Sequence, residues 1–348
     1  MGTSYYRRSL DFCIDLGRAG KRPEALAGDG ERVKTAAKQI RFSGLGMLWL
    51  IAIAVLAIRA PAFFTLANFT SVLQFSTLLA LVTLGQTFVI LTGGGGIDLS
   101  AGGIVSLAGL TIAFLIKQGT PAFLAEIAGV LFGGILGSIN GLIITRLRLL
   151  PLIVTLGTFY AYNGLALALT GGAPITGLPS SFGVLGQNAV LAIPLHTLVF
   201  VLPIFIVMMF VLTQTPLGRW IYAVGSNEKA SRLVGLPVDA IRLGVYILSG
   251  MLAALAGLVA DSWLLSARPN IGDNLELLSL TATLLGGTSI FGGSGGLTGS
   301  LIAVLFFTSL QIGLQMLNVN NIWQLGVVGL LLIGSVLMDR LLRTAWTA

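Results

Sequence analysis

Residues 122–144 read A-F-L-A-E-I-A-G-V-L-F-G-G-I-L-G-S-I-N-G-L-I-I, and this stretch decides the fold class of the whole chain. Its one charged side chain is Glu126. A helix needs about 20 consecutive, mostly apolar residues to cross a bilayer. A transmembrane β-strand would be about 10 residues long and would alternate in polarity. The stretch therefore predicts a membrane-spanning α-helix.

Four glycines in this stretch recur at every fourth position, which places them along one face of the helix. A face of small residues lets another backbone approach closely. We therefore predict a helix-packing ridge, either static or able to slide, at Gly129, Gly133, Gly137 and Gly141.

The composition extends this conclusion to the rest of the chain. Of its 348 residues 55 % are hydrophobic and 9 % are charged, against about 25 % charged in soluble domains. The chain has 46 glycines and a single cysteine, Cys13, which excludes an intramolecular disulfide framework. These values predict an all-α integral membrane protein.

Charges and Pro/Gly clusters divide the apolar sequence into about ten segments, of which the first, third and eighth are short enough to be broken or tilted. The predicted transmembrane helices are residues 43–58, 71–91, 101–116, 122–144, 149–170, 191–213, 243–265, 275–291, 297–317 and 321–338.

The distribution of Lys and Arg predicts the orientation, because these residues concentrate in short cytoplasmic loops. With ten spans and a cytoplasmic N-terminus, 17 of the 20 Lys and Arg residues fall on the cytoplasmic side. Both termini are then cytoplasmic, residues 1–42 form a cytosolic tail, and residues 43–343 form the transmembrane domain. The net charge of +7 follows from this bias and from anionic lipid, so it requires no nucleic-acid partner.

A run of four glycines, residues 93–96, precedes Ile97, Asp98, Leu99 and Ser100 between two apolar segments. Glycine disfavours helix and permits left-handed backbone, so we expect a turn or an unwound stretch. Asp98 and Ser100 stand where the cap of the next helix belongs. They are interpreted either as helix caps or as residues that line a solute pathway, since ionisable residues inside membranes are often functional.

The cytoplasmic loop 214–242 contains the sequence Asn227, Glu228, Lys229, Ala230, Ser231, Arg232. Ser226 or Asn227 can cap a short helix here, Glu228 favours its first turn, and Gly235 can end it. The sequence predicts a short amphipathic helix, which is either a docking element or a solvated helix without a partner.

Four motifs follow one another in the chain: GGIDLS at 95–100, WIYAVGSNEKASRLVGL at 220–236, YILSGMLAALAG at 246–257 and LLGGTSIFGGSGGLTGSLIA at 284–303. Their combination resembles the permease subunits of ABC importers for ribose, xylose and related monosaccharides. The resemblance runs from the first predicted span to the last. It implies a second permease subunit, two cytosolic ATPase domains and an external solute-binding protein.

The resemblance also implies that the loop docks on the ATPase as a coupling helix, with coupling positions Asn227, Glu228, Ala230, Arg232, Gly235 and Leu236. The chain contains no GxxxxGK[ST] phosphate loop, so ATP and Mg²⁺ are expected on the partner ATPase. We expect no cofactor or metal in this chain and no enzymatic activity of its own.

The solute pathway is expected to be narrow and mostly apolar, with scattered hydroxyl and amide groups that can replace water around a sugar. Each of them can instead be an interhelical hydrogen bond. The candidates are Asp98, Ser100, Gln86, Thr155, Tyr160 and Asn163. The chain departs from the resembled family at Leu278 and Asn163, where an acid and a base are missing, which favours a somewhat different polyol or sugar.

Two other functional classes of membrane protein are alternatives. An ion-coupled secondary transporter of a small polar solute would bury several ionisable groups near the middle of the membrane. We expect only Asp98 there, because Asp261 and Glu276 fall near span ends. A membrane-embedded enzyme would need a nucleophile or acid–base constellation, which the sequence does not offer.

Overall fold

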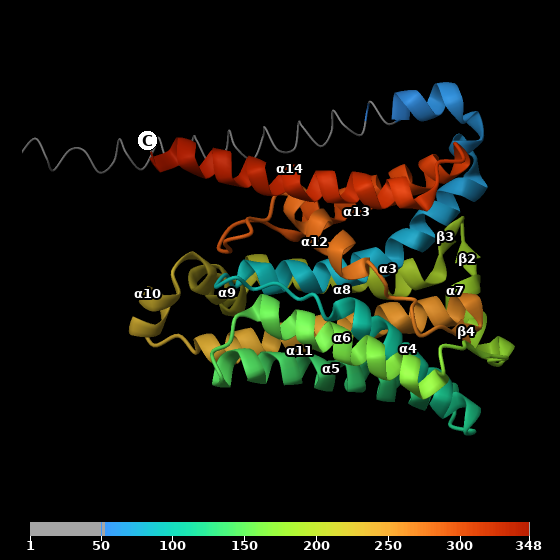
Figure 1. Ribbon diagram of the computed structural model, residues 1–348, viewed down its shortest axis with the longest axis horizontal. Helices are drawn as coiled ribbons and strands as arrows, with labels where there is room; N and C mark the ends of the chain where they lie inside the picture. Colours follow the sequence, from blue (N-terminus) through green and yellow to red (C-terminus); the bar gives the residue numbers. More distant parts are fainter. Residues whose placement is uncertain (1–49, 51–52, 348) are drawn as a thin grey trace, which may run out of the picture.

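The computed structural model describes residue 50 and residues 53–347, and this part of the chain is built almost wholly from helices (Figure 1). The predicted tail 1–42 and the start of the first predicted span lie outside the described residues. The end of that span is helical at 53–59 and is followed by the 3-10 helix η1 (Pro61–Phe64).

Each of the other nine predicted spans corresponds to a helix within the described residues. They are α3 (Leu66–Leu91), α4 (Ala101–Lys117), α5 (Ala122–Arg146), α6 (Pro151–Thr170), α8 (Leu202–Gln214), α11 (Val238–Leu264), α12 (Leu275–Leu285), α13 (Leu297–Met316) and α14 (Asn321–Thr347). Six helices of the described chain are long and apolar enough to cross a membrane, counting α8 with the π-helical turn η3 (Thr197–Val201) that precedes it.

Two predicted spans include residues that form a turn or a loop instead of helix. Residue 191, the predicted start of the sixth, lies instead in the turn between strands β2 (Ala189–Val190) and β3 (Ile193–Pro194), where Leu191 and Ala192 have positive φ. The predicted eighth span, 275–291, stops being helical at Gly286 because its last residues form a glycine-rich loop. Hydropathy counts apolar residues, and it does not detect a turn inside an apolar run.

Helix α11 lies at the centre of the molecule, where it contacts α5, α3 and α4 (Figure 1). Of the most apolar 18-residue stretch of α3, 83 % is buried, whereas only 17 % of the corresponding stretch of η3 and α8 is buried. The interior is therefore formed around α3, α4 and α11, and α8 belongs to the perimeter.

The two ends of the bundle differ in their small elements. Helices α9 (Pro216–Ser226) and α10 (Glu228–Leu233) lie at one end, on the left of Figure 1. The opposite end carries the β2–β3 hairpin, helices η2 (Ser180–Gly183) and α7 (Val184–Gln187), and the antiparallel pair β1 (Ile175–Thr176) and β4 (Ser266–Ala267).

The glycines of α5 face the central helices. Gly133 and Gly137 lie against the backbone of Gly250 in α11, and Gly141 lies against Leu243 of the same helix. Gly129 lies against Ile112 of α4. A Cβ at any of these four positions would overlap a neighbouring helix, so the close approach of α5 to α11 and α4 depends on glycine.

Candidate functional site

Between α3 and α4 the chain leaves the helical conformation for a turn. Gly93, Gly94 and Gly95 have φ values of 66°, 64° and 72°, which is the left-handed region that glycine adopts without steric cost. Residues 97–100 then run through the interior of the bundle to the start of α4, and Asp98 and Ser100 are fully buried there.

The Asp98 carboxylate is held by hydrogen bonds and has no positively charged partner among the described residues. Ser100 donates to Oδ1 from its backbone N–H at 3.0 Å and from its hydroxyl at 2.6 Å. Ser249 of α11 donates to Oδ2 at 2.7 Å. Asn140 of α5 in turn donates to the Ser100 hydroxyl at 2.7 Å. The cluster therefore joins α11, α5 and the start of α4 around one carboxylate.

Hydrogen bonds to the backbone hold the same segment in place. The Gln86 amide, oriented so that both of its ends are satisfied, donates to the carbonyl oxygen of Asp98 at 3.0 Å and accepts from its N–H at 3.3 Å. The hydroxyls of Thr155 and Tyr246 donate to the carbonyl oxygen of Ile97 at 3.1 and 3.3 Å. The non-helical backbone in the bundle interior is thus supplied with hydrogen-bond partners, as an apolar environment requires.

The structure brings four of the six pathway candidates together, namely Gln86, Asp98, Ser100 and Thr155. Tyr160 is not among them, because it lies on α6 with 68 % of its surface exposed. Asn163 is half-buried on α6 beside Gly103 of α4, and its Oδ1 is buried without a hydrogen-bond partner from residue 50 or residues 53–347.

Sequence reasoning missed two members of the Asp98 cluster. Asn140 is an amide in the middle of an apolar span, and that contrast was a signal that could have identified it. Ser249 lies on a distant helix, and nothing in its local sequence links it to Asp98.

Two further acidic side chains of the described residues are buried. Asp261 of α11 and Glu276 of α12 are also buried, against Gly109 and Gly102 of α4 respectively. Within the described part of the chain, both oxygens of Asp261 and the Oε2 of Glu276 have no hydrogen-bond partner. Asp261 lies near the end of α11 and Glu276 near the start of α12, and α4 covers both side chains.

Residues 93–98 are called the glycine turn below. Helix α10 forms a second candidate site, near the end of this turn that lies farther from Asp98. The side-chain oxygen of Asn227 accepts from the backbone N–H of Ala230 at 3.0 Å and caps the helix. Gly235, with φ of 83°, closes it. The predicted short helix is therefore present, with Asn227 and Gly235 at its ends. Leu233, the last residue of α10, is 88 % exposed, and Val234, which follows it, is 76 % exposed.

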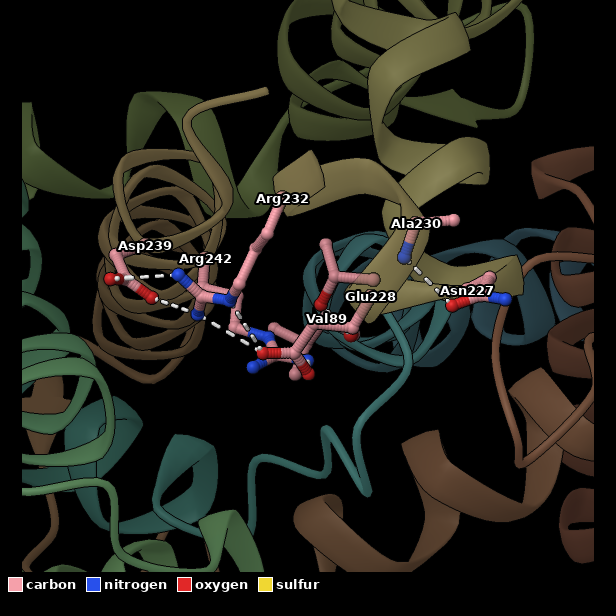
Figure 2. A network of polar contacts seen from close by, with 8 residues as sticks. Val89, Asn227, Glu228, Ala230, Arg232, Asp239 and Arg242 are labelled. Carbon is pink, nitrogen blue, oxygen red and sulfur yellow. Dashed lines mark hydrogen bonds and ion pairs between the residues drawn. The ribbon is translucent and has the colours of Figure 1, made fainter. Parts of the chain in front are cut away.

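Figure 2 shows the charged network that ties α10 to α11. Glu228 receives hydrogen bonds from Arg232 at 3.0 Å and from Arg242 of α11 at 2.7 Å. Arg232 also pairs with Asp239. Partial burial raises the pKa of Glu228, but the contacts with Arg242 and Arg232 outweigh it, so the pKa lies below its ordinary value. Glu228 is therefore ionised at neutral pH.

A cavity of about 210 Å³ lies between α12, α13 and α14, near the end of the bundle that carries the hairpin. Its polar lining residues are Asp273, Asn274, Gln311 and Gln324. Gln324 is 7 % exposed, and its Oε1 has no hydrogen-bond partner in the part of the chain that the structure describes. Amide and carboxylate groups of this kind can bind hydroxyl groups.

Comparison with known proteins identifies the family. The family model described as the permease component of the branched-chain amino acid transport system matches residues 68–336. The ribose import permease protein RbsC of Bacillus subtilis strain 168 is 40 % identical over 320 residues, which cover 89 % of this chain and 98 % of the relative.

Two further relatives differ in the solute that they are named for. The D-allose transport system permease protein AlsC of Escherichia coli K12 is 34 % identical over 322 residues, which cover 89 % of this chain and 98 % of AlsC. The autoinducer 2 import system permease protein LsrC of Yersinia enterocolitica is 33 % identical over 304 residues, which cover 87 % of this chain and 83 % of LsrC. No solved structure matches the chain. The chain therefore belongs to this family of permease components, and it is a multi-pass inner-membrane subunit of an ABC importer rather than an enzyme.

Proposed function

We propose that this permease moves a monosaccharide or a related polyol into the cell by alternating access. The observation that carries the proposal is the similarity, over most of the chain, to permeases named for ribose and D-allose import.

In this proposal a cytosolic ABC ATPase docks on α10 and supplies the energy, with ATP and Mg²⁺ bound to that partner. Three features of α10 support docking. The helix is rigidly capped at Asn227, its ion pairs join it to α11, and Leu233 and Val234 present exposed apolar side chains beside charged ones. Exposed apolar side chains outside the lipid suit a protein interface. The coupling positions are Asn227, Glu228, Ala230, Arg232, Gly235 and Leu236.

The proposal places the α9–α10 end and both chain termini in the cytoplasm, because Lys and Arg concentrate on that side. An external solute-binding protein then meets the opposite end, where the β2–β3 hairpin and α7 lie. A second permease subunit completes the assembly and lies beside this one in the bilayer.

The test is reconstitution of the chain in proteoliposomes with the ATPase and the binding protein produced alongside it. We expect uptake of radiolabelled D-ribose, D-xylose or D-allose. This uptake should require ATP on the side of the membrane that carries the ATPase, and the binding protein on the opposite side. A proton or sodium gradient alone is expected to drive no uptake.

The alternative is an ion-coupled secondary transporter. The observation that favours it is the burial of Asp261 and Glu276, whose Oδ1, Oδ2 and Oε2 atoms have no hydrogen-bond partner among the described residues. The same experiment separates the two functions. Accumulation of sugar by the isolated permease on an ion gradient, without ATPase or binding protein, would contradict the ABC mechanism.

A further inference from the structure

Two loops and the end of helix α9 meet next to α10, and they touch through their backbones. They are residues 92–96 after α3, the end of α9 at Gly225 and Ser226, and residues 286–296 between α12 and α13. The N–H of Gly293 donates to the carbonyl oxygen of Leu91 at 3.1 Å. A Cβ at Gly93 would lie 2.8 Å from the carbonyl oxygen of Gly225. No flexible side chain separates these segments, so a displacement of one must displace the others.

One face of α11 follows the glycine turn residue by residue. Arg242, Tyr246 and Ser249 are spaced four and three residues apart, which places them on one side of the helix. They contact the turn in the same order. Arg242 lies against Gly94, Tyr246 donates to Ile97, and Ser249 donates to Asp98. The turn and this face of α11 therefore form a continuous contact from the α10 end of the bundle to the buried carboxylate.

Arg242 is the member of this face that also reaches α10. Its Nη2 lies 2.7 Å from Glu228 Oε2, and its side chain is 13 % exposed. The same guanidinium occupies the space in which a Cβ at Gly94 would stand, and Gly94 has a φ of 64°. The absence of a side chain at position 94 thus lets the charged group of Arg242 rest directly on the backbone of the turn.

We propose that Arg242 is a positioning residue that carries movement of α10 to the glycine turn and through it to the Asp98 cluster. This inference rests on the proposed function, because it assumes that the ATPase acts on α10. An anchoring role alone explains the geometry less well. Partly exposed ion pairs contribute little to stability, and an anchor for α10 would not require contact with the backbone of Gly94.

The test compares solute transport with ATP hydrolysis in proteoliposomes that contain the complete complex. The solute is whichever of D-ribose, D-xylose and D-allose the wild type carries best. For Arg242→Ala we expect the number of solute molecules transported per ATP to fall about tenfold, a typical coupling between distant sites. ATP hydrolysis and co-purification of the ATPase should remain near wild type. Arg242→Lys should fall in between, because Lys keeps the charge and lacks the planar fork.

The matched control is Arg219→Ala, which removes an exposed arginine of α9 and should leave the ratio unchanged. Glu228→Gln is a second variant, which breaks the same ion pair by changing its partly exposed partner on α10. It tests the inference if the Arg242→Ala complex does not assemble. A purely structural role would lower hydrolysis and uptake together. That result, or a wild-type ratio in Arg242→Ala or Glu228→Gln, would overturn the inference.

The outcome is distinguishable from failure of the proposed function. A wild-type complex that shows no ATP-driven uptake of any of the three sugars contradicts the proposed function itself, and the inference falls with it. A wild-type complex that transports normally, beside an Arg242→Ala complex that transports equally well per ATP, contradicts the inference alone.

Discussion

Asp98 is a carboxylate inside a membrane protein that is satisfied by hydroxyl and backbone donors. Transfer of an isolated charge into an apolar interior is very costly, so a buried acid needs donors or a proton. Ser100 and Ser249 supply three donors to its two oxygens. The position of Asp98, at the junction of the turn and three helices, makes it the residue whose charge we expect to matter for transport.

For Asp98→Asn we expect the fold to persist, because the remaining carbonyl oxygen can still accept from Ser100 and the amide can meet the Ser249 hydroxyl. Uptake per molecule of permease should fall about tenfold, which corresponds to about 1.4 kcal/mol. The measurement is ATP-driven sugar uptake normalised to the amount of reconstituted protein, with the melting temperature as a check on folding. Wild-type uptake would leave Asp98 as a helix cap without a role in the pathway.

The contact between α5 and α11 illustrates how two helices are joined without a hydrophobic driving force. Lipid chains are as apolar as leucine, so helices in a bilayer associate through close packing. Gly133 and Gly137 of α5 meet the backbone of α11 at Gly250. The strength of this contact depends on the absence of side chains, and a single added methyl group must separate the two helices.

Gly137→Ala is therefore expected to destabilise the protein by about 1–3 kcal/mol, the usual cost of overpacking a well-filled interface. The added Cβ would lie 3.0 Å from the carbonyl carbon of Tyr246 and closer still to its oxygen. Gly157→Ala on α6 is the matched control, because a Cβ there meets no atom within 4 Å. Thermal unfolding in detergent measures both variants. Equal melting temperatures for Gly137→Ala and Gly157→Ala would show that the contact between α5 and α11 tolerates an added methyl group.

The whole molecule has two unlike ends, and its function depends on which end faces the cytoplasm. One end carries the charged network of α10, and the other carries the β2–β3 hairpin, where Leu191 is 93 % exposed (Figure 1). ATP is supplied in the cytoplasm, so the proposed mechanism requires α10 to face that side.

Cysteine labelling tests this orientation. In a Cys13→Ser background, Leu191→Cys should react with a membrane-impermeant maleimide added to intact cells stripped of their outer membrane, whereas Lys229→Cys should react only after the membrane is opened. The reverse pattern would contradict the positive-inside assignment and the docking of an ATPase on α10.

Some features of the fold could be predicted because they are local. A transmembrane helix satisfies its own backbone hydrogen bonds, so a long apolar run is sufficient to define it. The cap at Asn227 and the stop at Gly235 also depend on neighbouring residues only. The errors at residue 191 and after Gly286 arose where an apolar or glycine-rich segment turns, because hydropathy does not report backbone conformation.

The site could be predicted only in part, because the sequence does not give the rotation of a helix. Lipid and protein interior are both apolar, so an outward face such as that of Tyr160 and an inward one such as that of Thr155 look alike. The glycine run marked the turn at Asp98, but Ser249 lies 151 residues further along the chain. In the sequence, Arg242 is one of several basic residues of the loop 214–242, and nothing there indicates its contact with Gly94.

By itself, the sequence determined that the chain is a helical membrane protein and roughly where its long helices lie, since those properties depend on contacts within a few residues. Only the tertiary structure decided that Arg242, Tyr246 and Ser249 line up against the turn from Gly94 to Asp98, and that Asp261 and Glu276 are buried. Such pairings join segments far apart in the chain, and they depend on how the helices rotate and pack against one another.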